Sequence, residues 1–244
     1  QANQDFTATQ IMRTIGGTVR SNGVGLPGVA FGGVAGAAPS DANGVYAISV
    51  PYGWSGTITP IKEGYTFNPD AHSYVNYIVS VSDEDYTATL ITFTVSGRIT
   101  VNGTGLGGVV LQGFPESTTT GPDGAFSTTV PYGWSGVITP VLEGYLFTPA
   151  SKSYSVVTTA LSSQNFTSSL SAFSISGKAT WNGAGLEGVT LQGLPGNPAT
   201  QGDGTYNVSV AFDWSGTVTP RKTGFTFAPT SREYSKVQSV RTDQ

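Results

Sequence analysis

Residues 50–60 read VPYGWSGTITP, residues 130–140 read VPYGWSGVITP, and residues 210–220 read VAFDWSGTVTP. The three segments start 80 residues apart, and no insertion or deletion separates the copies over their shared landmarks. A spacing kept this strictly indicates a structural repeat, in which each copy is one unit of the fold. The same spacing relates four further sets of residues: Asn22, Asn102 and Asn182; Gly44, Gly124 and Gly204; Pro60, Pro140 and Pro220; and Tyr74, Tyr154 and Tyr234.

Each copy has the pattern of short β-strands. Segments such as FTVSGRITV, at residues 93–101, are rich in β-branched residues and lie between Asn-Gly, Pro-Gly and Asp-Gly pairs. Asn22-Gly23 and its two equivalents predict type I′ turns, since both central residues of that turn need positive φ. Gly and Pro recur too often for long helices. We predict an all-β fold of three tandem antiparallel β-sandwich (Ig-like) modules in a linear array, at residues 11–90, 91–170 and 171–244.

The composition excludes several function classes. The chain has 244 residues, a formal net charge of −4 and no cluster of Lys or Arg, so it lacks the basic face that nucleic-acid binding requires. No apolar run approaches the roughly 20 residues that a membrane-spanning helix needs. Cysteine is absent and His72 is the single histidine, which excludes disulfides, thiolate nucleophiles and His–His metal pairs. Few charges and many Ser, Thr, Gly and Asn favour a secreted surface protein.

The repeated text resembles a known class of module. GTVRSNGVGLPGV at residues 17–29 returns as GRITVNGTGLGGV and GKATWNGAGLEGV, and it is followed by NGVYAISVPYGWSGTITP and GYTFNP. This pattern is similar to the tandem Ig-like or carboxypeptidase-regulatory-like β-sandwich repeats of bacterial or archaeal surface proteins. The resemblance covers nearly the whole chain and implies a spacer, stalk or adhesive unit at the cell surface. It implies no catalytic residues and no cofactor.

The two ends of the sequence do not coincide with the boundaries of the 80-residue modules. Residues 83–89, DEDYTAT, and residues 163–169, SQNFTSS, close the first two modules, and a third copy would place its aromatic residue at position 246. The printed sequence ends at Gln244, so module three lacks its final strand. The missing text is found at the other terminus, where residues 3–9 read NQDFTAT and Phe6 precedes Tyr86 by 80 residues. In the 80-residue frame Gln244 matches Glu84 and Gln1 matches Val81, so the two ends overlap slightly.

Three interpretations of these ends compete. The chain is a fragment of a longer repeat protein, or residues 1–10 fold back onto module three of the same chain, or they insert into module three of another subunit. We favour the third, because an unpaired sheet edge is a liability unless it is filled and an added strand can fill it. A head-to-tail contact of this kind builds a homopolymer. The predicted donor residues are Asn3, Asp5, Phe6, Thr7, Ala8 and Thr9, and the predicted acceptor residues are Tyr234, Val237 and Val240.

Aromatic pairs beside a turn suggest an alternative function. A flat indole ring could stack on a sugar, which would make the protein a carbohydrate-binding or adhesin module; packing of Trp over the core is the competing interpretation. The residues concerned are Tyr52 and Trp54, Tyr132 and Trp134, and Phe212 and Trp214. The Asp-containing turns at residues 41–44 and 121–124 carry too few carboxylates for calcium, so we predict no metal.

Overall fold

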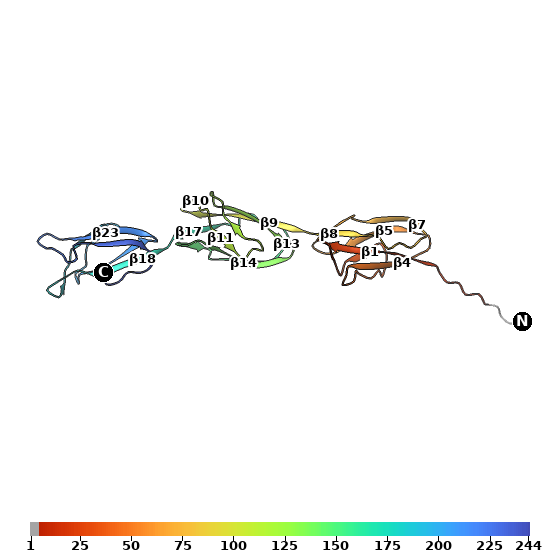
Figure 1. Ribbon diagram of the computed structural model, residues 1–244, viewed down its shortest axis with the longest axis horizontal. Helices are drawn as coiled ribbons and strands as arrows, with labels where there is room; N and C mark the ends of the chain where they lie inside the picture. The colour runs from red at the N-terminus through yellow and green to blue at the C-terminus, as the bar shows by residue number, and fades with distance from the viewer. Residues whose placement is uncertain (1–4) are drawn as a thin grey trace. The chain divides into compact units, whose positions relative to one another are not determined.

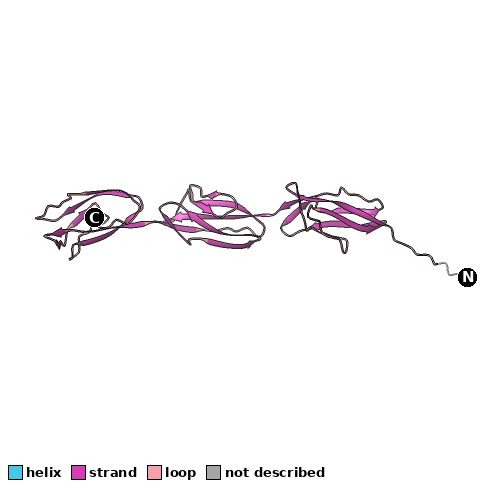
Figure 2. Cartoon of the chain, turned by 60° about the horizontal axis from the view of Figure 1, so that its bottom comes forward, coloured by secondary structure: helices cyan, strands magenta, loops and turns pink. Residues whose placement is uncertain are grey.

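The computed structural model describes residues 5–244, and every regular element in that range is a β-strand (Figures 1 and 2). Among these residues no helix is long and apolar enough to cross a membrane. The all-β prediction is therefore confirmed. The chain divides into two compact units, one of residues 1–94, 129–135 and 154–160 and the other of residues 95–128, 136–153 and 161–244. The division into three modules stays a prediction, and the repeats are described below one by one.

The first repeat contains two sheets. One has the order β2-β1-β8-β6 with β4 paired to β1, and the other has the order β3-β5-β7. Strand β4 shows why these residues form a sandwich: Tyr46, Ile48 and Val50 are buried while the residues between them are exposed, the period-two pattern of a strand with one face on a core. The strands are β1 (Met12–Ser21), β2 (Val24–Gly25), β3 (Ala30–Gly32), β4 (Val45–Pro51), β5 (Trp54–Ile61), β6 (Tyr65–Asn68), β7 (His72–Tyr77) and β8 (Tyr86–Leu90).

The second repeat has the same arrangement with one additional strand, β12. One sheet has the order β10-β9-β17-β15 with β13 paired to β9, and the other has the order β12-β11-β14-β16. The strands are β9 (Thr92–Val101), β10 (Thr104–Gly105), β11 (Val110–Gln112), β12 (Thr118–Thr119), β13 (Ala125–Pro131), β14 (Trp134–Val141), β15 (Tyr145–Thr148), β16 (Lys152–Val157) and β17 (Phe166–Leu170).

The third repeat has fewer strands than the other two. Its sheets are β18-β22, β19-β20 and β21-β23-β24. Residues 225–228, which match β6 and β15, form no strand, and residues 171–244 contain no segment that matches β8 and β17. The strands are β18 (Ala172–Lys178), β19 (Thr180–Trp181), β20 (Ala184–Gly185), β21 (Thr190–Gln192), β22 (Thr205–Ala211), β23 (Trp214–Arg221) and β24 (Arg232–Val237).

The predicted Asn-Gly turns have the backbone that type I′ requires. Asn22 has φ of 49° and Gly23 has φ of 79°, and both equivalent pairs have values within a few degrees of these. One pairing departs from the antiparallel expectation, because β8 runs parallel to β1 and β17 runs parallel to β9. The sequence pattern of a strand carries no sign of its direction, and the parallel pairing follows from the chain crossing over between the two sheets.

Candidate strand-acceptor groove

The closing strand of the first repeat is held on both of its edges. On one side Tyr86 lies opposite Val19 in the parallel pairing with β1. On the other side β8 pairs antiparallel with β6, where Ala88 faces Phe67. The second repeat copies this register with β17 between β9 and β15. The closing strand therefore completes one sheet and joins two segments that do not otherwise pair in that sheet.

An aromatic side chain anchors the closing strand in the core. Tyr86 is 2% exposed and Phe166, its equivalent, is 1% exposed. The Tyr86 hydroxyl donates to the backbone oxygen of Ile58 at 3.1 Å, which satisfies a polar group that burial would otherwise leave unpaired. Residues at one matched position flank the ring in each repeat: His72 meets Tyr86 edge-on at 4.8 Å between centroids, and the Lys152 ammonium lies 5.2 Å from the Phe166 centroid.

The residue that precedes the closing aromatic residue hydrogen bonds the closing strand to the first strand of the same repeat. Asp85 Oδ1 accepts hydrogen bonds from the Thr18 backbone N–H at 2.7 Å and from the Thr18 hydroxyl at 2.9 Å. In the second repeat Asn165 Oδ1 accepts from the Arg98 backbone N–H at 2.8 Å. An oxygen at this position is therefore a shared feature of both closing strands.

In the third repeat the chain follows the same path up to Gln244. The Tyr206 hydroxyl donates to the Gln244 backbone oxygen at 3.1 Å, as the Tyr46 hydroxyl does to that of Glu84. Ile175 forms the parallel bridge with Arg241 that Ile15 forms with Val81. The position of the closing aromatic would come two residues after Gln244. Up to Gln244, the third repeat thus repeats the contacts that precede the closing strand in the other two repeats.

A groove of about 240 Å³ lies where that strand would run. Its walls include Thr180 and Trp181 of β19 on one side and Phe225 and Phe227 on the other, which match the two segments that flank β8 and β17. Leu191 and Val218, both buried core residues, also line it. The groove is therefore apolar at its base and bounded by two backbone edges that have no strand between them.

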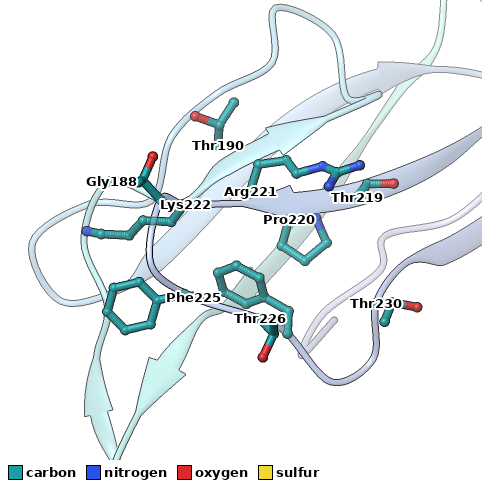
Figure 3. A pocket seen from close by; sticks show the side chains of 11 residues that line it. Gly188, Thr190, Thr219, Pro220, Arg221, Lys222, Phe225, Thr226 and Thr230 are labelled. Atoms are coloured by element: carbon teal, nitrogen blue, oxygen red, sulfur yellow. The ribbon is translucent and has the colours of Figure 1, made fainter.

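A second cavity of about 760 Å³ lies beside the groove (Figure 3). The two cavities share Pro220, Phe225, Thr226 and Phe227 in their linings. Residues 225–228 therefore lie between two hollows, and they form no strand where their equivalents in β6 and β15 do. In the other two repeats this segment pairs with the closing strand, and within residues 5–244 no strand pairs with residues 225–228.

The rim of the groove is positively charged. Lys178 and Arg232 both line it, and Arg232 occupies the position of His72 and Lys152 beside the closing aromatic. Burial raises the pKa of Tyr206, which also lines the groove, from 10.0 to about 12, so this hydroxyl stays protonated at neutral pH. Trp181 is 58% exposed, and its ring meets Phe225 edge-on at 5.9 Å between centroids. A large aromatic face is thus left open to solvent at this edge.

The predicted donor segment is extended away from any sheet. Residues 5–11 form no strand, and Asp5, Thr7, Ala8 and Thr9 are exposed. Phe6 is 96% exposed, which is the opposite extreme from its equivalents in β8 and β17. Asn3 lies outside the described residues.

The predicted acceptor residues lie in different environments. Tyr234 lines the groove. Val237 is 1% exposed within the core of the third repeat, where it pairs with Trp214, and Val240 is exposed three residues after the end of β24. The residues that sequence reasoning missed are Ala179, Thr180, Trp181, Phe225, Phe227 and Arg232. They would have been found by applying the 80-residue spacing to the partners of the closing strand, once those partners were known.

The tryptophans of the repeated segment pack within their own repeats. The Trp54, Trp134 and Trp214 rings lie 5.8–5.9 Å from the tyrosine rings at positions 74, 154 and 234. Trp54 is half-buried against the core and covers Gly56, where an added methyl group would clash with the indole. This arrangement is the core-packing alternative of the sequence interpretation. Within residues 5–244 no group of three or more His, Asp or Glu side chains is placed to hold a metal ion.

No protein-family model matches the chain, and no curated protein sequence matches it. Solved structures do resemble it. The Bacillus anthracis TIE protein superposes with a TM-score of 0.64 at 8% identity over 95% of this chain, and this chain spans half the length of that protein. BcpA, the major pilin subunit of Bacillus cereus, gives 0.46 at 10% identity over 95% of this chain and 98% of its own. The minor pilin GBS52 of Streptococcus agalactiae gives 0.29 at 10% identity over 65% and 97% of the two chains. At these identities the likeness to the TIE protein establishes an all-β fold shared with a solved bacterial protein.

Proposed function

We propose that the protein is a non-enzymatic structural subunit of an extracellular filament or surface stalk. Subunits join head-to-tail when residues 5–10 of one copy enter the strand-acceptor groove of another. The observation that carries this proposal is a sequence match: residues 5–9, DFTAT, are identical to residues 85–89, which comprise Asp85 and most of β8, except for Phe in place of Tyr. A segment with the sequence of a closing strand is exposed, and a repeat without its closing strand has an open groove.

The register of the inserted strand follows from the pairing in the other two repeats. Phe6 lies opposite Ala179, as Tyr86 lies opposite Val19. Ala8 lies between Trp181 and Phe227, because Ala88 lies between the equivalent Ser21 and Phe67. The strand runs parallel to β19 and antiparallel to residues 225–228, which become a strand on binding. Backbone pairing on both edges supplies affinity and the buried alternate side chains supply specificity, as in other cases of strand addition.

Two polar contacts support the same register. Asp5 takes the place of Asp85 and Asn165, so its carboxylate accepts from the backbone N–H of Lys178. Hydrogen bonds to a charged group are about twice as strong as neutral ones. Arg232 takes the place of His72 and Lys152 beside the ring of Phe6. A negatively charged strand thereby enters a positively charged rim.

A contact between different surfaces of identical subunits does not close on itself, so it generates a filament. Each subunit carries the donor segment at its N-terminal end and the groove in its third repeat, so a subunit that has used one of them in a contact still presents the other. The role of the sandwiches is mechanical: tightly turned repeats hold a regular spacing at the cell surface. The partner that this function requires is a second copy of the same chain.

The test compares the full chain with a closed chain, in which a copy of residues 165–170 follows Gln244 directly. Because Gln244 matches Gln164, the added strand fills the groove from within. We expect the full chain to form filaments, measured by light scattering and electron microscopy as concentration rises, and the closed chain to stay monomeric. A full chain that stays monomeric at every concentration would contradict the proposal.

A peptide of residues 1–10 provides the second arm of the test. It should bind the acceptor chain, which consists of residues 11–244, and change the fluorescence of Trp181 at the groove. A Trp181→Phe variant of the acceptor chain identifies the signal, because the other three tryptophans pack elsewhere. The closed chain should not bind the peptide. Equal binding to the closed chain would mean that the groove is not the site.

A further inference from the structure

The chain contains a second matched contact next to the closing strand. A methyl group placed on Gly64 would approach the ring of Tyr132 to 2.8 Å, and the Tyr132 hydroxyl hydrogen bonds to Glu63. Gly144 meets the ring of Phe212 in the same way. Both members of each contact belong to one compact unit. At each glycine the aromatic ring occupies the space that a side chain would need.

The residue after the closing strand links these two groups through its backbone. Ile91 N–H donates to the Gly64 oxygen at 2.8 Å, and the Ile91 oxygen accepts from the Tyr132 N–H at 2.8 Å. Ser171 repeats both bonds with Gly144 and Phe212, each at 2.8 Å. A closing strand is therefore followed at once by a fixed arrangement of glycine, backbone and aromatic ring.

Half of this arrangement is present beside the donor segment. Tyr52, the equivalent of Tyr132 and Phe212, donates its N–H to the Ile11 oxygen at 2.9 Å. The Arg13 guanidinium lies 5.2 Å from the Tyr52 centroid, at the position from which Phe93 flanks Tyr132. The ring of Tyr52 is nevertheless 53% exposed, whereas Tyr132 and Phe212 are less exposed.

The other half is present beside the groove. Gly224 matches Gly64 and Gly144, has φ of +84°, and has no atom within 4 Å of the place where a methyl group would sit. It lies between Thr223 and Phe225, which line the cavity of Figure 3. The printed sequence has no residue 80 positions after Ser171 to bond its oxygen. No residue within 5–244 fills the space at Gly224 that an aromatic ring fills at Gly64 and Gly144.

We infer that Tyr52 of one subunit packs on Gly224 of the next, and that Ile11 N–H of the first donates to the Gly224 oxygen. This inference rests on the proposed strand insertion, since residues 5–10 must bring Ile11 to the edge of the third repeat. It extends the interface from a single strand to a strand followed by a ring-on-glycine contact. We call this contact of Ile11 and Tyr52 with Gly224 the joint between subunits. It repeats the contacts that Ile91 and Ser171 make inside the chain.

One difference from the internal contacts offers a gain-of-affinity test. The Tyr132 hydroxyl has the Glu63 carboxylate as its acceptor, whereas position 223 holds Thr. Thr223→Glu would provide Tyr52 with the same carboxylate. Because hydrogen bonds to charged groups contribute more than neutral ones, we expect about tenfold tighter binding between subunits. Adding Tyr52→Phe in the donor should remove this gain, since the phenyl ring has no hydroxyl to donate.

The decisive experiment measures separately how much the joint and the inserted strand contribute to the affinity between subunits. Calorimetry measures the affinity of the acceptor chain for two donors, the closed chain and the peptide of residues 1–10, which ends before Ile11. Gly224→Ala in the acceptor chain should weaken binding of the closed chain about tenfold or more, because overpacking a close contact is costly, and leave peptide binding within twofold. Tyr52→Ala in the closed chain should weaken its binding similarly. Gly183→Ala is the matched control, since Gly183 has φ of +80° and open space around it.

Each outcome decides a separate question. Unchanged affinity of the closed chain in both the Gly224→Ala and the Tyr52→Ala experiments, with normal peptide binding, would overturn the joint and leave the filament proposal intact. Failure of the unmodified acceptor chain to bind either donor would overturn both. Equal weakening by Gly183→Ala would mean that the substitution acts on the fold, and this too would count against the joint. Thermal unfolding of each variant shows whether it is folded.

Discussion

Replacing Phe6 by alanine tests the proposed insertion, in which the Phe6 ring is the side chain that enters the core of the acceptor. Phe6 is 96% exposed in the chain, and in the proposed interface it would take the environment of Phe166, which is 1% exposed. Fully burying a phenylalanine side chain is favourable by about 1.5–3 kcal/mol. In a finished core Phe→Ala costs about 3–5 kcal/mol, because a void remains where the ring was. The peptide strand can shift to fill part of that void, so we expect a loss of about 2–4 kcal/mol.

This loss corresponds to a Kd at least about 30-fold weaker. Calorimetry of the closed chain against the acceptor chain measures it directly, and sedimentation of the full chain should show shorter filaments or none. The matched control is Phe6→Tyr, because Tyr86 is the natural residue at this position in the first repeat and donates its hydroxyl to the Ile58 oxygen. The Val218 oxygen is the equivalent acceptor, so Phe6→Tyr should bind as tightly as the parent or up to about tenfold tighter.

Two results would refute this reasoning. If Phe6→Ala binds as tightly as the parent chain, no aromatic ring enters the core of the acceptor. If Phe6→Tyr loses as much affinity as Phe6→Ala, the ring does not occupy the place of Tyr86 and the register is wrong. A loss that appears equally in the thermal unfolding of the free chain would point to a fold defect, which the exposure of Phe6 argues against.

Three further results are expected. In calorimetry, Asp5→Ala should weaken binding of the closed chain about fivefold to tenfold. Asp5→Asn should retain most of the affinity, because Asn165 supplies the same side-chain oxygen in the second repeat. Equal losses in the two variants would contradict the proposed register. Gly113→Ala should lower the free energy of unfolding by roughly 2–4 kcal/mol, since φ is +103° and the new methyl group meets the Val137 oxygen, whereas Gly103→Ala, with open space, should cost less in the same denaturant titration. Burial raises the folded-state pKa of Tyr206 to about 12, so the contribution of this hydroxyl to the free energy of unfolding is complete below about pH 10 and is lost as pH rises toward 12. Tyr206→Phe should therefore make the thermal stability fall less steeply between about pH 10 and about pH 12. An unchanged dependence of thermal stability on pH would contradict the raised pKa of Tyr206.

Much of the site was predictable because repetition makes equivalent positions visible. Phe6 could be matched to Tyr86 from text alone, and the alternation of buried and exposed residues in segments such as β4 predicts strands with one apolar face. The acceptor side could not be predicted as well, because its residues come from β19 and from residues 225–228, which are far apart in sequence. Of the three predicted acceptor residues, Tyr234 alone lines the groove.

The amino-acid sequence by itself determined the 80-residue repeat, the all-β fold, the Asn-Gly turns and the match between residues 5–9 and residues 85–89, since each of these depends on local residue types and their spacing. Only the tertiary structure decided which backbones the closing strand joins, that β8 runs parallel to β1, and that Gly64 carries the ring of Tyr132. These features depend on pairing between distant segments, and a strand's side-chain pattern specifies which face is buried but not which neighbour it meets or in which direction. The open groove has the same cause. Residues 225–228 have a sequence similar to β6 and β15, but no strand within residues 5–244 pairs with them, and they form no strand.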